Sequence, residues 1–189
     1  MTAMSTAATI ADRLETTFAR EGFAAPGVAA LHKAAGVTIR TLYRHFPSRE
    51  DMVVGALRHR HDRYLEGLAR GARGSEGRAA VLSIFDAVAA WITDETSTGC
   101  LFAQAQAAHP HSDAITTEVA RYRDAVRALF AAGVDRACPG VQDAEKVGLR
   151  DALFLLHEGQ VQAGAVIGAG AARDAARAAA AHLLEASGG

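Results

Sequence analysis

Cysteine and long apolar runs are both scarce in this sequence, and each shortage excludes a class of protein. Only two cysteines occur, Cys100 and Cys138, too few for a disulfide scaffold and ordinary for a reduced cytosol. We expect both to be small core residues. No apolar stretch is long enough to span a bilayer, because polar side chains such as His157 interrupt the best candidate, residues 152–172. The N-terminus also lacks the pattern of a secretory signal peptide, so we expect a soluble, cytoplasmic protein without membrane contact.

Sequence motifs for catalysis and for metal binding are missing as well. There is no G-x-S-x-G elbow, no glycine-rich phosphate loop and no cysteine–histidine signature. His59 and His61, like His109 and His111, are two residues apart, a spacing that points two helical side chains in different directions. We therefore predict that the protein is not an enzyme and that it holds neither a metal nor a cofactor.

The net charge of -1 conceals an uneven distribution along the 189 residues. Residues 1–73 hold 11 Lys and Arg against 7 Asp and Glu, whereas residues 74–189 hold 9 against 14. A modest basic excess at one end suits contact with phosphates, and an acidic remainder would not adhere to DNA. Ordinary surface charge would give the same numbers, so the charge alone leaves both interpretations open.

Apolar residues recur at helical spacing throughout the chain, and no segment alternates with the period of two that a strand requires. This pattern predicts an all-α fold. We expect a helix-turn-helix domain over residues 1–50, a connecting helix over residues 48–70, and a larger helical domain over residues 71–189. The glycine-rich break at residues 71–75 marks the expected hinge between the two domains.

Residues 36–50 read Gly-Val-Thr-Ile-Arg-Thr-Leu-Tyr-Arg-His-Phe-Pro-Ser-Arg-Glu and are the most informative part of the chain. Gly36 ends a preceding apolar helix, whose first turn begins at Pro26, and Pro47 stops the short helix that follows. Ser48 caps the next helix and leaves Arg49 beside its N-terminus, where free backbone N–H groups attract a phosphate. These features are typical of a DNA-binding recognition helix. Its outer face carries Thr38, Arg40, Thr41, Tyr43, Arg44 and His45.

This run resembles the TetR family of transcriptional regulators, whose N-terminal domains share the pattern gly-val-x-x-x-thr-leu-tyr-x-his-phe followed by a serine-led helix start. Residues 8–60 follow that family's three-helix domain in order and spacing, whereas the remainder resembles it only in length and helical character. The resemblance implies that Tyr43, His45 and Arg49 contact DNA phosphates and that Thr41 lies at a common contact position.

Arg40, with Thr38 as a second candidate, is better suited to reading bases, because a guanidinium can donate two hydrogen bonds to the O6 and N7 atoms of guanine. The chain departs from the family pattern in the preceding helix. Pro26, Gly27 and Ala29 stand there in place of a threonine cap and an arginine. We therefore expect this helix to make fewer phosphate contacts than is common in the family.

Bulky side chains on separate helices of the second domain have the composition of an apolar pocket with a few orienting polar groups, and equally that of a plain core. The family resemblance implies an effector cavity in this domain and so favours the pocket. We expect the effector to be a small apolar or amphipathic molecule. The candidate pocket residues are Phe85, Trp91, Phe102, Gln106, Tyr122, Phe130, Phe154 and His157, with Gln160 as a further polar group.

The last two predicted helices, over residues 143–169 and 171–186, are rich in alanine and glycine, which lets helix axes approach closely. One short recognition helix reads too few base pairs for useful specificity, so this helix pair suggests a two-fold homodimer formed over residues 143–186. The resemblance implies the same four-helix interface, and a buried terminal hairpin is the alternative. We also expect a polar break over residues 93–99 and a helix end near Gly133.

Together these features predict a ligand-responsive transcriptional regulator. We expect a repressor that a small molecule releases from an inverted-repeat operator in double-stranded DNA. The alternative is a small-molecule-binding or enzymatic helical bundle that no longer uses DNA. Loss of Tyr43, His45 and Arg49 would have supported that alternative, but all three are present.

Overall fold

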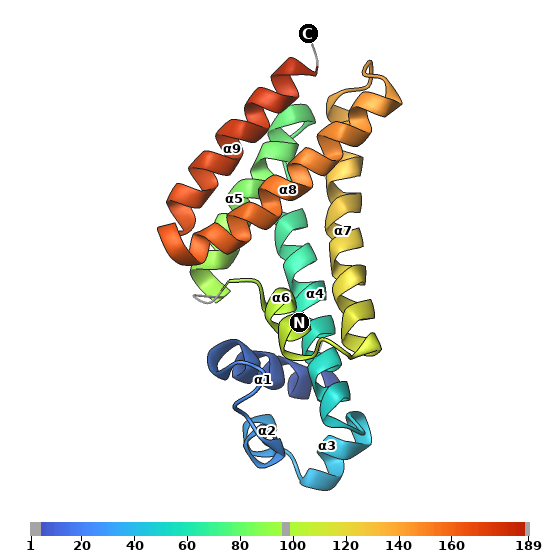
Figure 1. The fold of residues 1–189 in the computed structure, drawn as a ribbon, viewed down its shortest axis with the longest axis vertical. Helices are drawn as coiled ribbons and strands as arrows, with labels where there is room; N and C mark the ends of the chain where they lie inside the picture. Colours follow the sequence, from blue (N-terminus) through green and yellow to red (C-terminus); the bar gives the residue numbers. More distant parts are fainter. Residues whose placement is uncertain (1–4, 96–98, 188–189) are drawn as a thin grey trace. The chain divides into compact units, whose positions relative to one another are not determined.

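The computed structural model describes residues 5–95 and 99–187, and over these ranges the chain is helical and contains no strand. The prediction of an all-α fold is therefore confirmed. Helices follow one another with short connections (Figure 1). They are α1 (Thr6–Glu21), α2 (Val28–Ala35), α3 (Ile39–His45), α4 (Arg49–Gly71), α5 (Gly77–Glu95), α6 (Leu101–Ala108), α7 (Asp113–Ala137), α8 (Asp143–Ile167) and α9 (Ala169–Ala186).

The chain divides into two compact units that do not follow sequence order. The first unit combines the chain up to Arg63 with Cys100–Tyr122, and the second combines Tyr64–Gly99 with the chain from Arg123 onward. Helix α6 and the first part of α7 therefore group with the N-terminal helices. Helices α4 and α7 each contribute residues to both units.

In the first unit, α1 packs against α2, and α2 contacts α3. Ile10, Leu14 and Phe18 recur every four residues, form one apolar stripe of α1 and are completely buried. The hydroxyl oxygen of Ser5 accepts a hydrogen bond from the N–H of Ala8 at 3.2 Å, so a serine caps the start of the helix. This small core gives the short helices α2 and α3 a fixed support, which helices of 7 or 8 residues need.

In the second unit, α5, α8 and α9 lie side by side (Figure 1). Three alanines and a leucine form the buried face of α9, and their small size suits close approach of the helix axes. Gly168 separates α8 from α9 with a φ of 88°, a left-handed conformation that favours glycine. The buried residues of α9 are Ala172, Ala176, Ala180 and Leu184.

Several predicted helix boundaries need correction. Helix α7 does not end near Gly133 but continues to Ala137. Gly133 allows close packing inside the helix, since a Cβ at this position would lie 3.0 Å from Cγ2 of Val81. Helix α2 begins at Val28, so Pro26 precedes the helix instead of occupying its first turn. Helix α5 extends to Glu95, into the predicted polar break, and residues 96–98 of that break lie outside the described residues.

Both cysteines, Cys100 and Cys138, are free and buried, as expected. Among the described helices, none has the length and apolar character needed to cross a membrane.

Candidate nucleic-acid interface

The turn between α2 and α3 is fixed by a glycine. Gly36 has φ 63° and ψ 30°, the left-handed conformation that glycine adopts most readily. A Cβ at this position would also overlap the guanidinium of Arg13, which donates a hydrogen bond to the carbonyl of Ala35 at 2.7 Å. The backbone conformation therefore favours glycine here, and any larger residue would also displace the Arg13 guanidinium from the carbonyl of Ala35.

The inner side of α3 is anchored at both ends. At the start, the hydroxyl oxygen of Thr38 accepts a hydrogen bond from the N–H of Thr41 at 3.2 Å and lies 2.9 Å from the Thr41 hydroxyl. At the other end, Leu42 is completely buried and Phe46 nearly so. This helix of 7 residues is thus held by a cap and two core side chains, and its opposite face is left open to solvent.

The open face of α3 carries most of the predicted DNA contacts. Thr38, Arg40, Tyr43 and Arg44 are exposed. Thr41 and His45 are half-buried, and the Nε2 atom of His45 is buried without a hydrogen-bond partner. Ile39 is also exposed on this face, with an exposed fraction of 53%. The sequence did not predict this position, because an apolar residue is normally expected on the buried face of a helix.

The start of α4 confirms that Ser48 is a cap. The Ser48 hydroxyl oxygen accepts from the N–H of Asp51 at 3.0 Å, and the Asp51 carboxylate accepts from the N–H of Ser48 at 2.9 Å. Two donors at the helix start are therefore satisfied reciprocally, in the manner of a capping box. The carboxylate also accepts from the Ser48 hydroxyl at 2.7 Å.

Arg49 lies at the start of α4, as predicted, but part of its guanidinium is engaged inside the first unit. One terminal nitrogen donates to the carbonyl of Phe23, and the other lies 3.2 Å from Nε2 of His109. Nδ1 of His109 lies 3.0 Å from the carbonyl of Ala105, so Nδ1 carries the proton and Nε2 accepts from Arg49. This contact spans 60 residues, and no local pattern in the sequence indicates it.

A family model describes the segment that builds this interface. Residues 7–56 match the model of the bacterial regulatory proteins of the tetR family. The match includes α1, α2, α3 and the start of α4. The chain carries a TetR-family domain.

Solved structures resemble the whole chain at low sequence identity. A TetR-family transcriptional regulator from Streptomyces coelicolor is 20% identical with a TM-score of 0.85, over 98% of this chain and 91% of that one. A tetR-type regulator from Streptomyces avermitilis is 24% identical with a TM-score of 0.77, over 97% and 98%. One from Legionella pneumophila is 17% identical with a TM-score of 0.78, over 96% and 98%. These likenesses show that the helical fold beyond the TetR-family domain is shared too. No curated protein matches the sequence.

The eight predicted pocket residues are distributed over both units. Phe102, Gln106 and Tyr122 belong to the first unit, which also contains the TetR-family domain. There the rings of Phe102 and Tyr122 stack with their centroids 3.9 Å apart, and His61 meets the Tyr122 ring edge-on at 6.3 Å. Burial lowers the pKa of His61, and the positive charge of Arg121 lowers it further.

The other predicted pocket residues form an aromatic cluster in the second unit, with a histidine at its centre. His157 is completely buried, and its Nε2 atom lies 2.6 Å from the hydroxyl of Tyr64. The rings of Phe130 and Phe154 lie 6.0 Å and 6.4 Å from the His157 ring, and Trp91 packs edge-on against Tyr64 at 5.0 Å. Tyr64 was not among the predicted pocket residues, because nothing in the sequence around it indicates that its hydroxyl meets a histidine 93 residues away.

Two polar atoms of this aromatic cluster are buried without a hydrogen bond. They are Nδ1 of His157 and Oε1 of Gln160. Nδ1 lies 3.3 Å from a carboxylate oxygen of Glu158, without the alignment of a hydrogen bond. The amide nitrogen of Gln160 donates to the carbonyl of Phe85 at 2.8 Å, which fixes the orientation of its side chain. A buried polar atom without a hydrogen bond costs stability, so these two atoms are an unfavourable feature of an otherwise apolar cluster.

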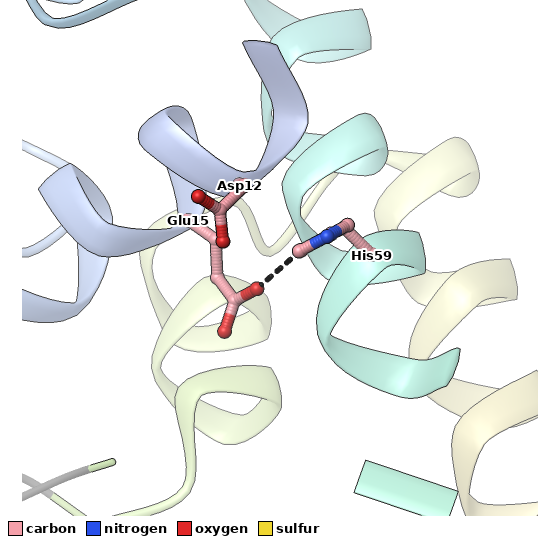
Figure 2. A group of neighbouring side chains, drawn as sticks. All are labelled: Asp12, Glu15 and His59. Atoms are coloured by element: carbon pink, nitrogen blue, oxygen red, sulfur yellow. Dashed lines mark hydrogen bonds and ion pairs between the residues drawn. The ribbon is translucent and has the colours of Figure 1, made fainter. Parts of the chain in front are cut away.

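The fold also brings together a histidine and two carboxylates that are far apart in the sequence. Asp12 and Glu15 of α1 face His59 of α4 (Figure 2), and one ligand atom from each lies within 4.8 Å of the others. The Glu15 carboxylate is already paired, with Nδ1 of His59 at 2.7 Å, Arg60 at 2.9 Å and Arg63 at 3.1 Å. Two guanidinium groups beside the same carboxylate repel a cation, so this group ties α1 to α4 and is unsuited to a metal.

Proposed function

We propose that this protein is a ligand-responsive repressor that binds an inverted-repeat operator as a homodimer and is released by a small apolar or amphipathic molecule. The observation that carries the proposal is the polar, basic face of α3. This face is open to solvent, and a glycine turn and two core residues fix its position. A second helix presented in this way is the arrangement that reads the major groove in helix-turn-helix proteins.

The exposed side chains of α3 separate into two kinds of DNA contact. Tyr43 delivers one hydroxyl on a rigid arm, which suits a phosphate, and phosphate contacts fix the position of the protein without reading sequence. Arg40 carries a guanidinium that can donate two bonds to a guanine, a pairing worth about 1–3 kcal/mol of discrimination. The two residues are both exposed, so substitution of either one tests its role without disturbing the core.

Selection of bound fragments from a random duplex library, followed by footprinting, tests the proposal. We expect an inverted repeat with half-site centres about 10 base pairs apart, because a two-fold dimer presents two identical recognition helices to one side of the duplex. Tyr43→Phe should weaken binding to all sequences alike, whereas Arg40→Ala should relax the preference at one base pair of each half-site. If the protein enriches no sequence and binds no duplex, the alternative of a bundle that no longer uses DNA holds.

The outer face of α8 supports the homodimer. Val147, Leu155 and Val166 are large apolar residues with more than half of their surface exposed. Gly159 lies on the same helix, and a Cβ there would meet no atom within 4 Å. An exposed glycine inside a helix costs about 0.5–1 kcal/mol of stability relative to alanine, and close packing of another helix against it can offset that cost. A second copy of α8 and α9 would cover these apolar side chains, and the absence of a side chain at Gly159 would let the two helices approach closely.

Sedimentation of two variants at the same position tests the homodimer. Gly159→Leu should convert the protein to a monomer, because the new side chain obstructs close approach while leaving the subunit unaffected. Gly159→Ala is the matched control: it gives the same gain in helix propensity and should retain the dimer. A Gly159→Leu protein that remains dimeric would place the interface elsewhere.

The aromatic cluster around His157 supports effector binding in the second unit. Two buried polar atoms that make no hydrogen bond, Nδ1 of His157 and Oε1 of Gln160, lie among apolar side chains. This is the composition of a pocket that orients a mostly apolar ligand with a few polar groups. Trp91 is the only tryptophan of the chain and packs against Tyr64, so its fluorescence reports on this cluster directly.

Helix α4 provides a physical route from effector to DNA. Its first residues belong to the first unit and its last residues, from Tyr64 onward, to the second. A ligand that prefers one position of this helix would also bias the separation of the two recognition helices, which must match the groove spacing. Moving the equilibrium from 1:99 to 99:1 requires a difference in affinity of about 10⁴-fold.

Titration of a panel of small apolar and amphipathic compounds, followed by Trp91 fluorescence and calorimetry, tests this coupling. Operator DNA must weaken compound binding by the same factor by which the compound weakens operator binding, because linkage is reciprocal. A compound that binds the His157 cluster with the same affinity in the presence and absence of operator would show that this cluster is not the regulatory site.

A further inference from the structure

Ile39 is an exposed apolar side chain at the position where a recognition helix reads bases. It is the first residue of α3, and 53% of its surface is exposed. In helix-turn-helix proteins, the N-terminal residues of the second helix are those that contact base edges. Isoleucine has no hydrogen-bonding group, so its contribution at this position has to be an apolar contact.

Ile39 and Arg40 are the side chains at the start of α3 that remain available for base contacts, because the neighbouring threonines are engaged within the helix. The hydroxyls of Thr38 and Thr41 are engaged with each other at 2.9 Å, and Thr38 also caps the helix. A base contact by Thr38 would have to compete with that cap. The exposed groups that remain at the start of the helix are the branched apolar side chain of Ile39 and the guanidinium of Arg40.

We infer that Ile39 determines operator specificity by packing against the C5-methyl group of a thymine, next to the base pair that Arg40 contacts. The thymine methyl is the apolar group that a base pair presents in the major groove, and it distinguishes a T·A pair from the others. Consecutive residues at a helix start point in directions about one quarter-turn apart, which suits contacts to neighbouring base pairs. The inference rests on the proposed DNA binding and specifies what the interface recognises.

Replacement of thymine by uracil tests the inference, because uracil removes the methyl group and leaves the hydrogen-bonding edge unchanged. The probe is the operator enriched from the random duplex library, with each thymine of a half-site replaced in turn in both half-sites. For wild-type protein we expect one position at which uracil weakens binding by about 15-fold, since burial of one methyl group contributes roughly fourfold at each of two half-sites.

Two variants assign that effect to a side chain. Ile39→Ala should bind the thymine and uracil operators equally, and folding is not at risk because the side chain is exposed. Arg40→Ala is the matched control, which should lose its guanine preference and keep the full response to uracil.

The possible failures are distinguishable from one another. Wild-type protein that binds its operator tightly but responds to uracil at no position would overturn the inference and leave the DNA-binding function intact. A uracil response that persists in Ile39→Ala would assign the methyl contact to another residue. Absence of binding to every duplex would overturn the proposed function itself.

Discussion

Arg49 has two potential partners, and replacing it by alanine distinguishes them. Inside the protein its terminal nitrogens face the carbonyl of Phe23 and Nε2 of His109. A guanidinium has five N–H donors, however, and these two contacts leave further donors directed away from them. Arg49 also begins α4, where free backbone N–H groups favour an anion. We therefore expect the same side chain to contact His109 and a DNA phosphate.

The size of the effect follows from counterion release. Each phosphate contact adds about 0.9 to the slope of log affinity against log salt concentration. The proposed dimer would lose two such contacts in Arg49→Ala, so the slope should fall by about 1.8. Between 50 and 200 mM salt, wild-type protein should then lose roughly tenfold more affinity than the variant.

Fluorescence anisotropy with a labelled operator, measured over this range of salt concentration, gives the two slopes. His109→Ala is the matched control, because it removes the internal contact while Arg49 keeps its charge, and its slope should equal that of wild-type protein. If Arg49→Ala and wild-type protein have the same slope, Arg49 makes no phosphate contact and serves only to hold α4 to Phe23 and His109.

Three further predictions concern the buried polar groups of the first unit and the role of the aromatic cluster. Glu15→Gln should lower the free energy of unfolding by about 3–5 kcal/mol, because it removes the carboxylate from the buried Arg60. Glu66→Gln, which breaks the exposed pair with Arg70, should cost under about 0.5 kcal/mol in the same urea titration, and equal effects would contradict the argument. Because burial lowers the pKa of His61 from 6.5, the unfolded chain takes up a proton more readily than the folded one, so stability should fall as the pH drops below 6.5. His61→Gln should flatten that part of the stability profile, and an unchanged profile would show that other groups cause it. Tyr64→Phe should alter Trp91 fluorescence and the affinity for any compound that binds near His157, while leaving operator affinity without compound within about twofold, a change of ~0.4 kcal/mol. A large loss of operator affinity in this variant would indicate a structural role instead.

Local chemistry in the sequence was enough to predict the helical fold and the helix-turn-helix at the N-terminal end of the chain. The spacing of Ile10, Leu14 and Phe18 predicts α1, and the sequence from Gly36 to Arg49 predicts a turn, a short helix and a capped helix. These features depend on interactions within a few residues, such as the Thr38 cap and the left-handed conformation of Gly36. A glycine in the sequence can mark either a helix end or a close packing contact. Gly133 was predicted to end a helix, but it lies inside α7 against Val81.

The partners of the buried polar groups were decided by tertiary structure alone. The Tyr64 hydroxyl contacts His157, 93 residues away in the sequence, and Arg49 contacts His109, 60 residues away. The Glu15 carboxylate of α1 is paired with three side chains of α4: His59, Arg60 and Arg63. The grouping of α6 with the N-terminal helices also could not be predicted from the sequence. The periodicity of a helix specifies which face is buried but not which distant side chain it meets, because that depends on how whole helices pack. The sequence therefore determined the helix-turn-helix and the exposed face of α3, and the tertiary structure decided which buried polar groups hold these helices in place.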